Sequence, residues 1–177
     1  LKKVSEVAKN IQNQLSAMDI SVKYDDRDAY RSGWKFNEYE LKGVPVRIAI
    51  GPKDLEAQQV EICRRDTLEK YSVTLNDVVN HIPTLLDTIQ NNMFDKAKQF
   101  RDEHITSVNT WEEFEAAIEK GGFVYAHWDG TIETEVAIKE KTKATIRCIP
   151  FNNPQENGKC ILTGKPSKER VLFAKAY

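Results

Sequence analysis

The sequence predicts an α/β protein built from two units. Short apolar runs typical of strands are interspersed with stretches whose apolar residues recur at helical spacing. One helical pattern begins at Asn76 and continues for roughly thirty residues, and a new series of elements starts near Ile105. A chain of 177 residues can form one large domain or two small ones. We therefore expect domains over 1–104 and 105–177.

Composition indicates an ordinary globular protein, with 40% hydrophobic and 30% charged residues. The net charge of −1 gives no global positive field, although a local patch can still bind nucleic acid. The sequence contains no run of eighteen apolar residues, so no membrane-spanning helix is expected. The N-terminus LKKVSEVAKN lacks the apolar stretch of a signal peptide. Three widely spaced cysteines fit free thiols in a reducing compartment, so we expect a cytoplasmic protein.

The first unit opens with apolar residues at helical spacing, which predict an amphipathic helix over 3–17. Ile20, Val22 and Tyr24 then alternate, which predicts a strand. A helix that leads directly into a strand often follows an earlier strand, so the first strand of the domain is expected to be missing from this chain.

Further elements of this unit follow from apolar pattern and from Gly and Pro breaks. We expect a polar loop over 25–33, a short helix over 34–41 and a strand over 46–50. A Gly51-Pro52 turn over 51–54 should follow, and then two more strands over 60–64 and 70–75. The long helical pattern after Asn76 contains Pro83, which predicts either a kink or the first residue of a new helix.

The second unit carries a capping box, Thr110-Trp111-Glu112-Glu113, so a helix should begin there and end at Gly121-Gly122. After it we expect a strand over 123–128, a helix over 132–141 and a strand over 144–149. A polar loop over 150–158 and a final strand over 171–176 should complete the unit.

Candidate functional residues concentrate in the stretch from Asp25 to Asp54. Glu40 could accept hydrogen bonds from N1–H and N2–H₂ of an unstacked guanine, while Arg47 and Lys53 could donate to O6 and N7. Nearby aromatics, Phe36 among them, could stack a base that is splayed from an RNA loop. The same residues also fit a purely structural role, with aromatics in the core and charges as a solvated rim.

Other candidate sites are less specific. His127, Asp129, Cys148 and Cys160 could bind a metal, but the paired CxxC spacing of structural zinc sites is absent. A cationic run could touch RNA phosphates or form a solvated helix end, and it comprises Lys139, Lys141, Lys143 and Arg147. No nucleophile–base motif occurs, so the chain itself is not expected to be catalytic.

The segment DDRDAYRSGWKFNEYELKGVPVRIAIGPKDLE closely resembles the anticodon-binding domain of prolyl-tRNA synthetase of the archaeal and eukaryotic type, which also occurs in some bacteria. The segments ATIRCIPF, KCILTGKPS and VLFAKAY resemble the extra C-terminal domain of that type. The resemblance covers the whole chain. It implies a mixed-sheet class II synthetase anticodon-binding domain followed by a small α/β domain, with the catalytic domain, its ATP and its Mg²⁺ outside this chain.

The resemblance also implies roles for particular residues. In this family the domain reads two guanines of the proline anticodon, and the contacts map onto Glu40, Arg47 and Lys53. Lys70 is a further candidate, and Phe36 is our own candidate for stacking. The implied partners are tRNA(Pro), the catalytic domain and, in the full-length enzyme, a second copy of the protein. No membrane partner is expected.

Two family features concern the C-terminal domain. Many relatives carry four zinc-binding cysteines there, and the matching positions here are Asp129, Thr134, Cys160 and Thr163. We therefore expect a degenerate zinc site and no bound metal. The family ends on a tyrosine whose carboxylate approaches the catalytic centre, and the matching tyrosine here is Tyr177.

A free-standing RNA-binding homologue and a protein-interaction module remain the alternatives.

Overall fold

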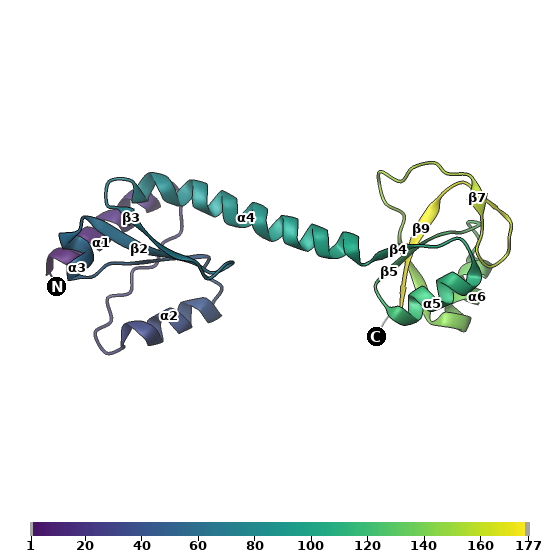
Figure 1. The fold of residues 1–177 in the computed structure, drawn as a ribbon, viewed down its shortest axis with the longest axis horizontal. Coiled ribbons are helices and arrows are strands. Elements are labelled where there is room, and N and C mark those ends of the chain that lie inside the picture. Colours follow the sequence, from purple (N-terminus) through teal and green to yellow (C-terminus); the bar gives the residue numbers. More distant parts are fainter. Residues whose placement is uncertain (1, 176–177) are drawn as a thin grey trace. The chain divides into compact units, whose positions relative to one another are not determined.

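A computed structural model of the chain describes residues 2–175. It separates into two compact units, Leu1–Asp95 and Lys96–Tyr177, and the long helix α4 (Val78–Glu103) runs through the division. Each unit is described by itself. Figure 1 shows the elements of both units in chain order by colour.

The first unit is a three-stranded antiparallel sheet with helices on both faces. Its elements before α4 are α1 (Lys2–Ser16), α2 (Ser32–Leu41), β1 (Val46–Ala49), α3 (Pro52–Glu56), β2 (Gln59–Arg64) and β3 (Lys70–Thr74). The strand order is β1-β2-β3. In Figure 1, α2 lies across these strands from α1 and α4.

The alternation of side chains along the strands gives the sheet two different faces. On one face, Val60 and Ile62 of β2 are fully buried in a core with Ile11 and Leu15 of α1 and with apolar residues of α4. The other face carries Cys63 and its cross-strand partner on β1, and it is covered by α2. The candidate site lies on this second face.

Two expectations for the first unit are wrong. Ile20 and Val22 do pack against the core, but their segment forms no strand in the described structure. The alternation reflects burial of every second side chain, and an irregular extended segment satisfies that pattern as well as a paired strand does. The supposed turn after Gly51 is a short helix, α3, which Asp54 caps by accepting a hydrogen bond from the Gly51 N–H at 2.8 Å.

Pro83 lies inside one continuous helix rather than at the start of a new one. It follows five helical residues and lacks the N–H that would close a turn of α4. Ile82 and Leu85 on either side of it are buried in the core, so packing holds the helix across the proline.

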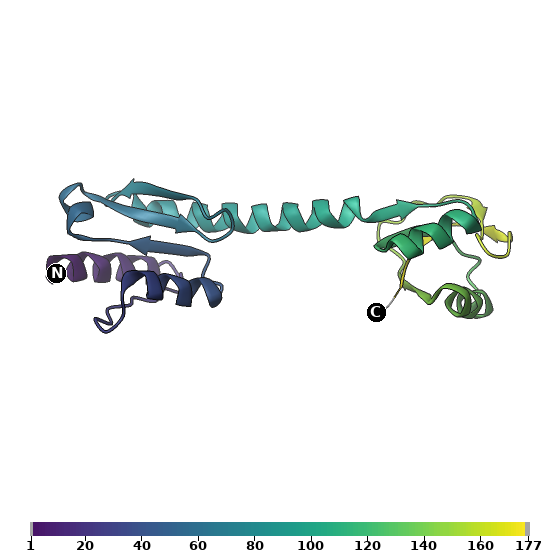
Figure 2. The same ribbon diagram turned by 60° about the horizontal axis from the view of Figure 1, so that its bottom comes forward.

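The second unit is a four-stranded mixed sheet in the order β4-β5-β9-β6. Its elements are β4 (Ile105–Ser107), α5 (Trp111–Lys120), β5 (Phe123–His127), α6 (Ile132–Thr142), β6 (Ala144–Cys148), β7 (Gly158–Lys159), β8 (Pro166–Ser167) and β9 (Arg170–Lys175). β4 and β5 are parallel and are joined through α5, while β9 is antiparallel to both of its neighbours. Figure 2 shows α5 and α6 beside these strands.

The core of this unit joins both helices to the central strands. Phe114 of α5 and Phe173 of β9 are fully buried and meet edge to face, with ring centroids 5.1 Å apart. The predicted capping box is confirmed: Thr110 Oγ1 accepts from the Glu113 N–H at 3.2 Å, and the Glu113 carboxylate accepts from the Thr110 N–H at 3.2 Å. Gly121 ends the helix at φ 91°, a conformation that favours glycine.

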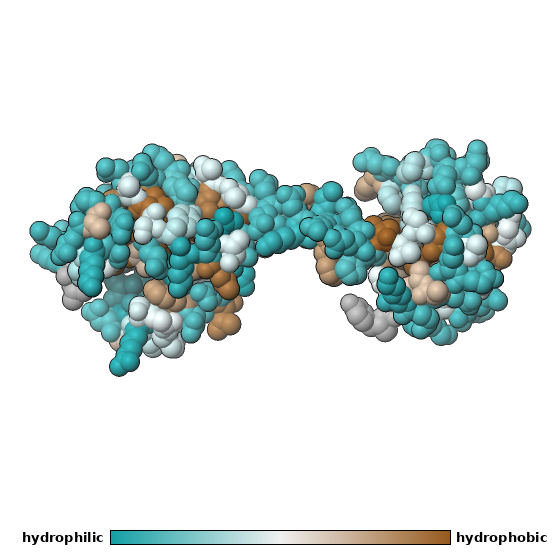
Figure 3. All heavy atoms as spheres, in the orientation of Figure 1, coloured by the Kyte–Doolittle hydropathy of each residue, from teal (hydrophilic) through white to brown (hydrophobic). Residues whose placement is uncertain are grey.

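Among residues 2–175, no helix is both long enough and apolar enough to cross a membrane. Hydrophilic side chains cover most of α4, the longest helix, on the face that Figure 3 shows.

Candidate nucleic-acid interface

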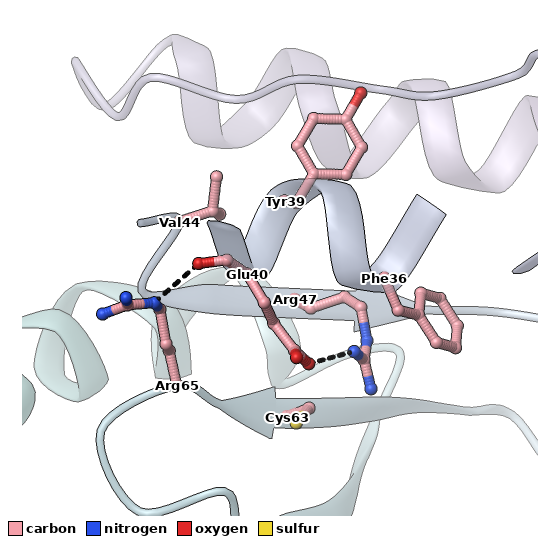
Figure 4. A pocket seen from close by; sticks show the side chains of 7 residues that line it. All are labelled: Phe36, Tyr39, Glu40, Val44, Arg47, Cys63 and Arg65. Carbon is pink, nitrogen blue, oxygen red and sulfur yellow. Dashed lines mark hydrogen bonds and ion pairs between the residues drawn. The ribbon is translucent and has the colours of Figure 1, made fainter. Parts of the chain in front are cut away.

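The candidate site lies where α2 meets β1. Phe36 and Glu40 are four residues apart on α2, so they share one side of the helix. Arg47 projects from β1 on the face of the sheet that α2 covers. Its Nη1 lies 3.1 Å from Glu40 Oε1, and its Cζ lies 3.7 Å from the centroid of the Phe36 ring. Figure 4 shows this arrangement, in which the guanidinium is held between a carboxylate and an aromatic face.

Burial differs between the two charged partners. The Arg47 side chain is only 14% exposed, and the Glu40 side chain is 44% exposed. Arg47 Nε is buried and has no hydrogen-bond partner among the described residues. The guanidinium is thus fixed by packing and by one ion pair, and Glu40 presents its carboxylate to solvent. An exposed carboxylate acceptor therefore stands beside a firmly held cation.

A shallow pocket surrounds this pair and includes a cation that sequence reasoning did not identify. The lining residues are Phe36, Tyr39, Glu40, Val44, Arg47, Cys63 and Arg65. Arg65 Nε donates to the main-chain oxygen of Glu40 at 2.9 Å (Figure 4). Twenty-five positions separate the two residues along the chain. The pairing of β1 with β2 brings them together. Predicting this contact requires the strand register, which a sequence pattern does not contain.

Lys53 and Lys70 lie outside this pocket. Lys53 is an exposed residue of α3, beyond the end of β1. Lys70 is an exposed residue of β3 and stands opposite Cys63, which in turn stands opposite Arg47. Directly opposed residues share one face of a sheet, so Arg47, Cys63 and Lys70 form a row across the three strands. Of the predicted cations, only Arg47 therefore lies in the pocket with Glu40.

The loop before α2 is fastened to that helix by charge. Arg27 Nη2 lies 2.7 Å from Asp25 Oδ2 and 2.6 Å from Glu38 Oε2. Hydrogen bonds from Arg27 hold the pKa of Asp25 well below its usual range, although partial burial opposes them. Tyr30 and Trp34 stack with ring centroids 4.1 Å apart, and both are partly exposed. These contacts fix the start of the helix that carries Phe36 and Glu40.

In the second unit, three threonine hydroxyls surround the Asp129 carboxylate. Thr131 Oγ1 donates to Oδ1 at 2.9 Å, while Thr134 Oγ1 and Thr163 Oγ1 donate to Oδ2 at 2.9 and 2.8 Å. Burial raises the pKa of Asp129, but the hydrogen bonds together lower it by a larger amount. The net effect is a pKa below the usual value for an aspartate. We call this cluster the Asp129 clasp, because it ties the loop before α6 to the turn after Cys160.

The residues considered as metal ligands do not form one site. Within residues 2–175, no group of three or more His, Cys, Asp or Glu side chains lies close enough to hold a metal ion. Cys160 is buried, and Cys148 is exposed on β6. His127 is buried with Nδ1 3.1 Å from Ser167 Oγ.

The cationic run near the end of α6 is dispersed. Lys139 and Lys141 lie in the last turn of the helix, and Lys143 follows it in the left-handed conformation at φ 64°. Arg147 donates to the main-chain oxygen of Ala174 at 3.2 Å. The predicted role of Tyr177 falls outside the described residues.

Comparison with known proteins places both units. Residues 1–85 match the family described as anticodon binding domain, and residues 111–177 match the family described as prolyl-tRNA synthetase, C-terminal. The whole chain is similar to curated proline–tRNA ligases: it is 56% identical to those of Christiangramia forsetii and Porphyromonas gingivalis and 51% identical to that of Bacteroides fragilis. The chain spans 36% of the length of each of these relatives. The first unit is therefore similar to an anticodon-binding domain and the second to the C-terminal domain of prolyl-tRNA synthetases.

Proposed function

We propose that this chain is the tRNA-recognition part of a proline–tRNA ligase and that its first unit reads guanines in the anticodon of tRNA(Pro). The observation that carries this proposal is the Glu40–Arg47 pair. Its exposed carboxylate accepts from N1–H and N2–H₂ of a guanine, and neighbouring cations donate to O6 and N7. The names of the relatives support the choice of tRNA(Pro).

The geometry refines the part proposed for Phe36. The Arg47 guanidinium already covers one face of the Phe36 ring. Planar guanidinium groups stack on bases as aromatic rings do. A splayed base therefore stacks on the outer face of Arg47, and Phe36 supports that cation from behind. Lys53, exposed on α3, is available for a second base or its neighbouring phosphate.

In the longer protein, the ligase would use ATP and Mg²⁺ in its catalytic domain to join proline to tRNA(Pro), with Tyr177 directed to that centre. The resemblance of the C-terminal segments is our reason for proposing the archaeal and eukaryotic type in the form that also occurs in bacteria, the source of the relatives named above. We also propose a dimeric, cytoplasmic enzyme, and the three free cysteines agree with a reducing compartment.

We further propose that the second unit is stable without zinc. Structural zinc sites use four thiolate or imidazole ligands. Of the four positions that match zinc-binding cysteines, only Cys160 keeps a thiol, and Thr134 and Thr163 donate their hydroxyl protons to Asp129. These hydroxyl protons occupy the Asp129 oxygen that would have to coordinate a metal. This set of side chains therefore does not fit zinc. Metal analysis of the purified protein tests the proposal, and one zinc per chain would contradict it.

The direct test of anticodon reading uses a synthetic anticodon stem-loop of tRNA(Pro). Binding is measured for the guanine-containing loop and for loops in which each guanine is replaced by adenine. Loss of a good base contact costs about 1–3 kcal/mol, which is roughly 5- to 150-fold in affinity. Equal affinity for all loops would reject anticodon reading and favour RNA binding without base specificity. No binding to any loop would favour a protein-interaction module.

A further inference from the structure

We infer that Arg65 is a phosphate-binding residue that holds the anticodon loop against the Glu40–Arg47 pair. The inference rests on the proposed function of the same site, and it assigns a sequence-independent contact beside the base-reading ones. Arg65 lies in the chain directly after β2 and lines the pocket that contains Glu40 (Figure 4).

The side chain of Arg65 is exposed and yet fixed at one end. Its Nε donates to the Glu40 main-chain oxygen at 2.9 Å, and its own N–H donates to the Pro45 main-chain oxygen at 2.9 Å. Nη1 and Nη2 make no hydrogen bond or ion pair with any residue in the described part of the chain. A guanidinium held in this way offers two free donors, and its side-chain entropy is already reduced before a ligand arrives.

The other arginines around the site are differently engaged. Arg47 is largely covered and paired with Glu40, and Arg64 is paired with Asp66 at 2.8 Å. Arg65 is therefore the cation of this pocket whose terminal donors remain available among the described residues. The adjacent carboxylate suits a base edge but repels a phosphate. A cation at this position offsets that repulsion for an RNA loop whose base approaches Glu40.

Lys70 extends the cationic surface away from the pocket. It lies in the row with Cys63 and Arg47, so its Cα is about 10 Å from that of Arg47. Lys70 is thus a second exposed cation on the face of the sheet that carries Arg47.

The test compares Arg65→Gln with Arg101→Gln in the 177-residue chain. Arg101 is an exposed arginine of α4 that does not line the pocket, so its variant makes the same charge change outside the pocket. The probes are the guanine-containing stem-loop and its adenine-substituted form. Binding constants are measured between about 50 and 200 mM salt, where phosphate contacts are most evident.

For a phosphate contact, Arg65→Gln weakens binding of both RNAs by the same factor, about tenfold, and lowers the slope of log K against log salt by about 0.7. Arg101→Gln changes neither quantity. Arg65→Lys keeps the charge and retains most of the slope even though it loses the Nε contact. This variant and thermal melts separate lost phosphate binding from altered folding.

Two results would overturn the inference without touching the proposed function. If Arg65→Gln leaves affinity and slope unchanged while the guanine loop is still preferred, Arg65 binds nothing. If it weakens the guanine loop alone, Arg65 acts through Glu40 or on a base instead of a phosphate. Failure of the proposed function has a different signature, since wild-type protein would then bind the guanine and adenine loops equally.

Discussion

Replacing Asp129 by Asn tests whether the Asp129 clasp holds the second unit together. The carboxylate accepts two threonine hydroxyls at Oδ2, at 2.9 and 2.8 Å, and one at Oδ1. An amide of the same shape turns Oδ2 into a donor, so the bonds from Thr134 and Thr163 are lost unless those hydroxyls reverse. A net hydrogen bond to a charged group contributes about 1.5–3 kcal/mol. Allowing for reversal, we expect a loss of about 2 kcal/mol in unfolding free energy.

Urea unfolding followed by tryptophan fluorescence measures this loss. Trp128 donates its indole N–H to the Thr131 main-chain oxygen at 3.0 Å, so it reports on the clasp. The matched control is Thr106→Val, at an exposed position of β4. We expect Thr134→Val to cost about 1 kcal/mol and the control close to none. Unchanged stability of Asp129→Asn, or stabilisation of the wild type by added zinc, would refute the reasoning.

Three further predictions concern stability. Thr110→Ala removes the N-cap of α5 and should cost about 1 kcal/mol in urea unfolding. Hydrogen bonds from Arg64 lower the pKa of the Asp66 carboxylate to about 2 from 3.8. The ionised group therefore stabilises the fold by about 2 kcal/mol above pH 4, and this contribution is lost as the pH falls from 4 to 2. Asp66→Asn should flatten that pH dependence of the unfolding free energy. Gly158→Ala places a Cβ in collision with the His127 ring and should lower the melting temperature, whereas Gly33→Ala, with open space, should not.

Local signals predicted the elements that local interactions determine. The Thr110 capping box gave the start of α5, and Gly121 gave its end, because both depend on hydrogen bonds within a few residues. Alternation misled at Ile20 and Val22, since burial alone produces it. The two-residue strands β7 and β8 were missed because they are too short to show a period.

The candidate site was only partly predictable for a related reason. Glu40 and Arg47 stand close together in the sequence, but their residue types alone fitted both a guanine edge and a solvated rim. Arg65 and the Asp129 clasp depend on contacts between distant segments. Thr163 lies thirty-four positions from Asp129, and no motif of either segment predicts that its hydroxyl meets that carboxylate.

The central claim is that the Glu40 carboxylate reads the N1–H and N2–H₂ edge of a guanine. A double-mutant cycle tests it most directly, with Glu40→Gln in the protein and inosine, which lacks the N2 amino group, in place of each anticodon guanine. We predict that inosine at one position weakens wild-type binding by about tenfold and that this penalty largely disappears in Glu40→Gln. An inosine penalty of the same size in both proteins would contradict the account.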